Sequence, residues 1–347
     1  MKKSNEKERG EKIIGIDVSK QTLDVVLLNS QEKILLQKQW KNTLNGILKI
    51  IKLAEKNDCF VVMEATGVYH LNLANHLHAA KRDVSVVNPL VIKRYAEMRM
   101  LRAKTDKLDA KIIACYGLNQ KLQRYVPPSE NQDKIKIISH FIDNLKKLIN
   151  QNKNQIEALK HHTCPYIEII DIYKKKNMEL EEEVKVYTKK LNKLISDTYP
   201  EESKKVLKIK GVGLVLCSII FGYYRNFEHF ENAKQVVAYA GLNPSPYQSG
   251  TSVKKKARIS KRGDTRIRNV LYCCSLSAKR YNPDCKALYE RLISKGKSKK
   301  EARIAVAAKL LRQCFAVVKY KREYKSFYYL EQQENYSKKM EKMKNVA

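Results

Sequence analysis

The sequence is poor in acidic residues, with 36 Asp and Glu against 69 Lys and Arg, which leaves a net charge of +33. It also lacks a long uninterrupted apolar run and a signal-peptide pattern, which argues against a membrane protein or a secreted one. A positive field of this size favours polyanionic partners, with nucleic acid first and a membrane surface second. Because 43% of the 347 residues are hydrophobic, the chain can bury a core, and its length suits two domains or one with a long insertion.

The cysteines give no sign of a redox or metal site. The chain holds eight, none of them in a CxxC pair, and no group of Cys and His has the spacing of zinc ligands. Most lie inside apolar patterns. We therefore expect reduced core thiols in a cytosolic protein.

Hydrophobic patterning over the first third predicts three strands, followed by strands that alternate with helices. The strands are expected at 12–18, 23–29, 33–40, 59–65 and 83–89, and the helices at 43–56, 68–81, 91–99 and 106–118. Short breaks between the first three strands indicate an antiparallel meander. This order predicts an α/β domain with a mixed sheet of the ribonuclease-H-like kind.

Residues 130–200 follow a heptad spacing instead, with one polar seam position at Asn152 and a second at Asn177. The Pro-containing break at 161–166 divides the pattern into two long helices. They predict either an antiparallel coiled-coil hairpin or arms for dimerisation, and the spacing does not choose between these.

The last third is predicted to be mainly α. Gly211-Val212-Gly213 resembles the turn of a helix-hairpin-helix, whose glycines let backbone amides approach a phosphate, although a plain turn explains it as well. Helices are expected at 230–242, 266–280 and 299–319, with a Pro/Ser/Gly loop at 243–252.

Four carboxylates stand out by position: Asp17 and Glu64 end predicted strands, and Asp106 and Asp109 open a predicted helix. Strand ends and helix starts are where open α/β sheets place their chemistry. Each acid alone has an ordinary explanation, such as an acidic first helical turn, a helix cap or a turn residue, and we interpret Asp24 as a turn residue. Their joint placement at one sheet edge favours a site for two Mg²⁺ ions, which would relieve the repulsion among four carboxylates.

The motifs around these acids carry a family resemblance. GIDVSKQTLDV, MEATGVYH and RAKTDKLDAKIIA resemble the three motifs of the DEDD insertion-sequence transposases, which are related to the pilin-gene DNA invertases. The resemblance implies a RuvC-like N-terminal domain. It also implies that the Asp-Glu-Asp-Asp tetrad of that family corresponds to Asp17, Glu64, Asp106 and Asp109.

A basic, serine-containing stretch follows in the last third. Its composition predicts a surface that binds the phosphate backbone of DNA or RNA, with a merely solvated basic loop as the alternative. The predicted phosphate contacts are Lys104 near the tetrad and Lys254, Lys255, Lys256, Arg258, Lys261, Arg262, Arg266 and Arg268 in the stretch itself.

The same stretch resembles the C-terminal transposase domain of the DEDD family. Its elements Gly241-Leu242, Ser249-Gly250 and Gly263-Asp264 match the GL, SG and GD elements of that domain. The resemblance implies that Ser249 is the catalytic serine, with Ser245 and Ser252 as the next candidates. The local sequence QSGTS departs from the common form of the family.

The resemblance implies a DNA transposase that cleaves and rejoins strands through two Mg²⁺ ions and a serine nucleophile. It further implies a guide RNA, a homo-oligomer (dimer or tetramer) and a nucleoid-associated location in a prokaryotic cytoplasm. The predicted parts are a RuvC-like domain at 12–125, a coiled-coil hairpin at 130–200, a transposase domain at 203–320 and a basic tail at 321–347.

Two other functions stay open on the sequence. A nuclease of the Holliday-junction resolvase type would use the same tetrad with water as the nucleophile. A basic packaging protein would bind nucleic acid without chemistry and would not need the carboxylates.

Overall fold

The computed structural model describes residues 12–100, 106–163, 166–249 and 253–327. The chain divides into two compact units, residues 1–127 and 128–347. Each unit has its own hydrophobic core, and each is described by itself.

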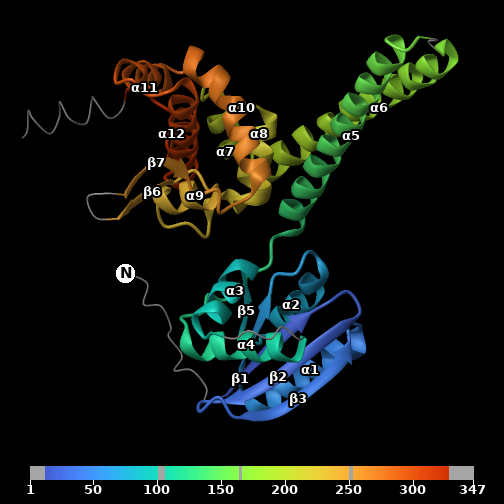
Figure 1. The fold of residues 1–347 in the computed structure, drawn as a ribbon, viewed down its shortest axis with the longest axis vertical. Helices are drawn as coiled ribbons and strands as arrows, with labels where there is room; N and C mark the ends of the chain where they lie inside the picture. The colour runs from blue at the N-terminus through green and yellow to red at the C-terminus, as the bar shows by residue number, and fades with distance from the viewer. Residues whose placement is uncertain (1–11, 101–105, 164–165, 250–252, 328–347) are drawn as a thin grey trace, which may run out of the picture. The chain divides into compact units, whose positions relative to one another are not determined.

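The first unit is built on a five-stranded mixed sheet with the order β3-β2-β1-β4-β5 (Figure 1). The strands are β1 (Lys12–Val18), β2 (Thr22–Asn29), β3 (Ile34–Lys41), β4 (Phe60–Glu64) and β5 (Val84–Val87). The first three strands form an antiparallel meander, and β4 and β5 run parallel to β1. This topology is that of the ribonuclease-H-like fold, so the predicted fold class is confirmed.

Helices cover both faces of this sheet. They are α1 (Leu44–Asn57), α2 (Tyr69–Ala79), α3 (Pro89–Met98) and α4 (Asp106–Asn119). One core joins the β1 residues Ile14 and Ile16 to α1 and α2, and a second joins Ile13 and Val62 to α3 and α4. The central strands are buried on both sides, which is why their sequences are nearly continuous apolar runs.

Asp24 was predicted to be a turn residue, and that interpretation is wrong. It lies inside β2, opposite Asp17 in the register, with only 6% of its surface exposed. The Gln39 side chain on β3 donates to both of its carboxylate oxygens, at 3.0 and 3.1 Å. This amide supplies the hydrogen bonds that a buried carboxylate requires.

Two long helices open the second unit, α5 (Glu130–Lys160) and α6 (Ile167–Thr198), and they pack side by side (Figure 1). A capping box starts α5, because the Ser129 hydroxyl and the Gln132 side chain each accept from the other residue's backbone N–H. The two polar positions of the predicted seam meet across the pair, with Asn152 Nδ2 donating to Asn177 Oδ1 at 2.9 Å. A supercoiled geometry for this pair stays a prediction.

The rest of this unit is mainly α, as predicted. Its elements are α7 (Pro200–Leu207), α8 (Leu214–Ser218), η1 (Ile219–Tyr223), η2 (Arg225–Phe227), α9 (Ala233–Tyr239), β6 (Pro244–Ser249), β7 (Val253–Ile259), α10 (Thr265–Tyr281), α11 (Pro283–Ser294) and α12 (Lys299–Lys319). The predicted loop at 243–252 is instead largely the strand β6, paired antiparallel with β7. Among the described residues, no helix is long and apolar enough to cross a membrane.

Candidate active site

Asp17 and Glu64 lie at the same end of two adjacent parallel strands. The register pairs Gly15 with Val62 and Ile16 with Met63, so Asp17 and Glu64 follow one position later on β1 and β4. Val62 belongs to the core on the α4 face, and side chains two residues apart on a strand share a face. Both acids therefore belong to the α4 face of the sheet, about one strand spacing of 4.8 Å apart, and both are half-buried.

The helix α4 crosses this face in direct contact with β1 (Figure 1). A Cβ atom on Gly15 would collide with the backbone O of Ala110 and the backbone N of Ala114, so only glycine permits this approach. One turn nearer the end of α4, Gly117 packs in the same way against the Ile13 side chain. Successive turns of α4 thus step along β1 toward its amino end, and the start of α4 lies toward the carboxyl end of the strand.

This packing fixes where the two acids of α4 lie along the sheet. Four helical residues advance about 6 Å, and two strand residues advance about 6.6 Å. Since Ala110 lies over Gly15, Asp106 begins the helix at the level of Asp17. Asp109 precedes Ala110 directly and is half-buried. The structure therefore gathers Asp17, Glu64 and the start of α4 at one end of the sheet, while the side chain of Asp106 lies outside the described part.

We expect Gly15→Ala to push α4 away from the sheet. The added methyl group meets backbone atoms, which cannot rotate aside, so the free energy of unfolding should fall by about 1–3 kcal/mol. Because Asp109 moves with the helix, strand cleavage should fall as well. Thermal melting and a cleavage assay measure both effects.

Gly213→Ala is the matched control, because nothing lies within 4 Å of a Cβ placed there and its backbone is extended. Unchanged melting and cleavage in Gly15→Ala would contradict the packing described above.

A polar clamp holds the other end of α4. The Glu32 carboxylate, in the turn between β2 and β3, accepts from Arg99 at 2.8 and 2.9 Å and from Asn119 at 3.0 Å. The hydrogen bonds from Arg99 hold the pKa of Glu32 at about 2, and burial raises the pKa of the neighbouring Cys115 thiol to about 11. Glu32 is therefore ionised and Cys115 protonated at neutral pH, and the pair serves to fix α4.

The donor set at the sheet end suits Mg²⁺, which prefers carboxylate oxygens and retains several water ligands. Within the described residues, no group of three or more His, Cys, Asp and Glu side chains is arranged to hold a metal ion. That observation does not test the predicted tetrad as a whole, because the side chain of Asp106 lies outside the described part. Asp24, opposite Asp17 on the same face, is a buried neighbour of this site that the sequence interpretation missed.

The predicted serine lies on a β-hairpin in the second unit. Ser249 ends β6 and pairs with Val253 at the start of β7. Its side chain lies outside the described part, as do the side chains of Lys254, Lys255 and Lys256 and all of Lys104 and Ser252. Ser245 is exposed on the same strand, opposite Arg258.

The GL and GD elements of the sequence form the base of this hairpin. Gly241 has a φ of +68°, which favours glycine, and the Lys261 backbone N–H donates to its carbonyl at 3.1 Å. A Cβ on Gly263 would collide with the Tyr239 carbonyl and lie 2.8 Å from the Gly241 nitrogen. Asp264 caps α10 by accepting from the Arg266 N–H at 2.7 Å. We call the close packing of Gly263 against the Gly241 backbone the glycine clasp.

The predicted phosphate-binding residues divide into two groups. Arg258, Lys261 and Arg262 are exposed on the hairpin and its continuation. Arg268 is half-buried, and its guanidinium donates to the Gly263 carbonyl at 2.6 Å and to the Thr265 hydroxyl at 2.9 Å. These contacts give Arg268 a role in holding the clasp, and phosphate binding by it stays a prediction.

Arg266 is engaged more completely. Its guanidinium donates to Asp143 at 2.5 Å, to Ser139 at 2.6 Å and to the Tyr223 hydroxyl, and its side chain is 16% exposed. Burial raises the pKa of Tyr223, which therefore stays neutral. The network joins α10 to α5 and η1. These contacts indicate that Arg266 has a structural role, and they add no support for phosphate binding by it.

We expect Arg266→Ala to lower the free energy of unfolding by about 2–3 kcal/mol, because Asp143 and Ser139 lose a charged partner. Arg258→Ala is the control, since Arg258 is exposed and makes no ion pair with another described residue. Chemical denaturation measures both variants. Equal stability of the two would show that Arg266 does not support the fold.

The predicted helix-hairpin-helix turn has a simpler explanation. Gly211 has a φ of +100°, and a Cβ there would lie 2.7 Å from the Ala278 Cβ on α10. Close packing against α10 therefore accounts for this glycine, and the plain-turn interpretation is favoured.

Two family models match the chain. One, described as a transposase model, matches residues 14–165, which include Asp17, Glu64 and Asp109. The other, described as the Transposase IS116/IS110/IS902 family, matches residues 203–290, which include the glycine clasp and Ser249.

Individual relatives agree with these models. The chain is 28% identical over 324 residues to the pilin gene-inverting protein of Moraxella lacunata, covering 90% of this chain and 97% of that protein. The figures for the pilin gene-inverting protein of Moraxella bovis are the same. A solved structure of T. thermophilus RuvC in complex with a Holliday junction substrate matches 33% of this chain and 99% of that one, at 12% identity and a TM-score of 0.27. On the two models, which together match more than half of its residues, the chain belongs to the IS116/IS110/IS902 family of transposases.

Proposed function

We propose that this transposase cleaves and rejoins DNA strands to excise and insert a mobile element, with its carboxylates and Ser249 acting on one phosphate. The placement of Asp17 and Glu64 at one sheet end, with the start of α4 above them, is the observation that carries this proposal. Family membership and the net charge of +33 support DNA as the substrate.

Asp17, Glu64, Asp106 and Asp109 would hold two Mg²⁺ ions. Bound there, Mg²⁺ would neutralise charge on the phosphate and favour deprotonation of an attacking hydroxyl. The carboxylates position that phosphate, and the close packing of α4 on Gly15 keeps the two acids of α4 beside those of the strands.

Ser249 supplies the nucleophile in this proposal. Its Oγ attacks the phosphorus, so that a serine–phosphate bond forms and the bond to one strand's oxygen breaks. The departing oxygen takes a proton and leaves as a free hydroxyl. A hydroxyl of the second strand then attacks the same phosphorus, the serine–phosphate bond breaks, and the serine recovers its proton. No external energy source is needed, because each new ester bond replaces an old one.

Exchange between two duplexes needs at least two such sites, which supports a homo-oligomer, either a dimer or a tetramer. The α5–α6 pair is the proposed means of joining copies. A guide RNA is proposed as a further partner, since the positive charge suits a second polyanion, and the proposed location is the cytoplasm near the nucleoid.

The test is strand exchange between two labelled duplexes that carry the element's ends and its target. We expect joined products only when Mg²⁺ and the RNA encoded beside the gene are both present. EDTA should abolish them. Joined products without the RNA would refute guidance, and the absence of joined products with all components present would refute the proposal.

A structure-specific nuclease is the second candidate, because the carboxylate end belongs to a unit that is compact without the serine hairpin. A nuclease would release nicked strands with free ends and form no protein–DNA bond. Denaturing gels of the same reactions distinguish nicked strands from joined ones.

A further inference from the structure

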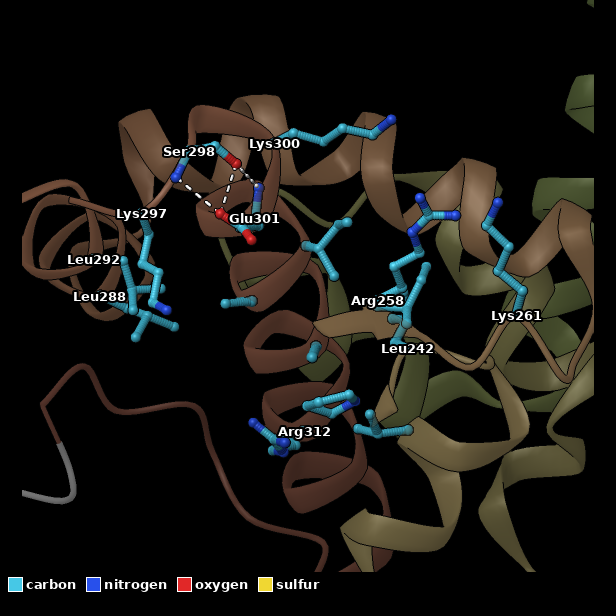
Figure 2. A pocket seen from close by; sticks show the side chains of 16 residues that line it. Leu242, Arg258, Lys261, Leu288, Leu292, Lys297, Ser298, Lys300, Glu301 and Arg312 are labelled. Carbon is cyan, nitrogen blue, oxygen red and sulfur yellow. Dashed lines mark hydrogen bonds between the residues drawn. The ribbon is translucent and has the colours of Figure 1, made fainter. Parts of the chain in front are cut away.

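A cavity of about 750 Å³ lies beside the base of the serine hairpin (Figure 2). It is lined by the hairpin base, α9, α11 and one stripe of α12, and it is open to one side. Its floor is aliphatic, and the side chains that form most of it are Leu242, Ile259, Leu288, Leu292, Ile304 and Ala308. The volume lies within the usual range for ligand pockets of about 300–1,000 Å³.

Cations surround this floor. Figure 2 shows Arg258 and Lys261 on the hairpin side, Lys297 and Lys300 around the start of α12, and Arg312 farther along that helix. All five are exposed, and none forms an ion pair with another residue in the described part of the chain.

The residues at the rim include one acid, Glu301, and its carboxylate caps the start of α12. The Glu301 carboxylate accepts from the Ser298 backbone N–H at 3.0 Å and from its hydroxyl at 2.7 Å, in the capping box that begins α12. Five cations therefore face the opening against one acid that is already hydrogen-bonded.

A ligand that matches this cavity has an apolar, flat part and an anionic part. An unstacked nucleotide has both, because its base can enter the aliphatic floor while its phosphates remain at the rim. Arginine side chains add planar guanidinium groups that stack on bases. An acidic amphipathic helix also has both parts, but its charges follow one side, whereas these cations come from the hairpin, the α11–α12 turn and α12.

We propose that this cavity binds an unstacked nucleotide of a single-stranded nucleic acid and so positions the strand for the serine hairpin. The inference rests on the proposed action on DNA strands. The strand β6 leads from Pro244 at the cavity to Ser249, a distance of about 17 Å for five residues. A nucleotide held in the cavity would fix the strand a short, constant distance from the nucleophile.

The test uses the full chain without Mg²⁺, so that no cleavage occurs. Fluorescence anisotropy compares a labelled mixed-sequence single strand with an abasic strand of equal length and charge. Ala305→Phe fills the cavity without a change in charge. We expect it to weaken binding of the mixed-sequence strand about tenfold, a change of about 1.4 kcal/mol, and to leave the abasic strand unaffected.

Further variants separate the base from the phosphates. Leu292→Gln places a polar group at a half-buried position near the end of α11 without a change in charge. The variant should fold, and we expect the same loss as for Ala305→Phe. Arg312→Gln should weaken both strands and lower the slope of log K against log salt by about 0.7. Lys193→Gln, at an exposed position on α6, is the control for loss of one charge and should not distinguish the strands.

Equal binding of the mixed-sequence strand by the wild type and both cavity variants would overturn the proposal. So would an acidic amphipathic peptide whose binding requires the open cavity while binding of the strand does not. If strand exchange is normal but binding does not depend on the bases, only the proposed nucleotide site in the cavity is refuted. If binding depends on the bases but no strand exchange occurs, only the proposed function is refuted.

Discussion

Asp17→Asn is expected to lower the rate of Mg²⁺-dependent strand cleavage by about 10³-fold or more, while the protein stays folded. A bound metal supplies several kcal/mol of stabilisation to the charge of the transition state, and each 1.36 kcal/mol is a factor of ten in rate. The neutral amide keeps the shape of the carboxylate but is a weaker Mg²⁺ ligand. Single-turnover cleavage of labelled DNA at several Mg²⁺ concentrations measures the effect.

Asp24→Asn is the matched control for this change. Asp24 is the register partner of Asp17 across β1 and β2, has the same chemistry and lies on the same face, yet it is hydrogen-bonded to Gln39 and belongs to no predicted tetrad. We expect cleavage within about tenfold of the wild-type rate, with any loss appearing in stability instead. If Asp24→Asn abolishes cleavage and Asp17→Asn does not, the assignment of the acids is wrong.

Ser249→Ala is expected to remove covalent protein–DNA adducts and to lower strand exchange by about 10⁴-fold or more, because a nucleophile has no substitute within its own mechanism. Adducts are trapped by denaturing the reaction and are separated from free DNA on a gel. DNA binding should be unchanged, since the variant keeps every cation of the hairpin.

Ser245→Ala provides the comparison on the same strand. Ser245 is exposed and lies opposite Arg258, so its loss should disturb neither the hairpin nor the adduct. Adducts that persist in Ser249→Ala and disappear in Ser245→Ala would move the nucleophile to Ser245. Adducts in neither the variants nor the wild type would favour the nuclease.

The fold of the first unit could be predicted from the sequence because its strands other than β3 are largely buried on both faces. Such strands leave unbroken apolar runs, and the short breaks between the first three predict a meander. The strand β6 could not be recognised in the same way, since PSPYQS contains two prolines and no alternation. A proline is tolerated there because a two-stranded hairpin has free edges. The helix α11 was not predicted either, although Asn282 followed by Pro283 is a helix-start signal.

Some residues of the candidate site could be predicted from the sequence, and others could not. Strand ends and helix starts are local features, so Asp17, Glu64 and Asp109 could be selected from the sequence alone. Contacts between distant residues leave no such pattern. The sequence does not reveal that Gly15 admits α4, nor that Arg266 binds Asp143, which is 123 residues away. For that reason, Arg266 resembled its exposed basic neighbours.

The pairing of Asn152 with Asn177 has a consequence for domain swapping. If the turn between α5 and α6 opened, α6 of one copy could pack on α5 of another in place of its own. The amide of Asn152 would then need Asn177 of the other copy, because any shift in register would bury an amide against apolar side chains. The same requirement holds in the opposite direction. A swapped pair would therefore make the amide contact twice and be related by a two-fold axis.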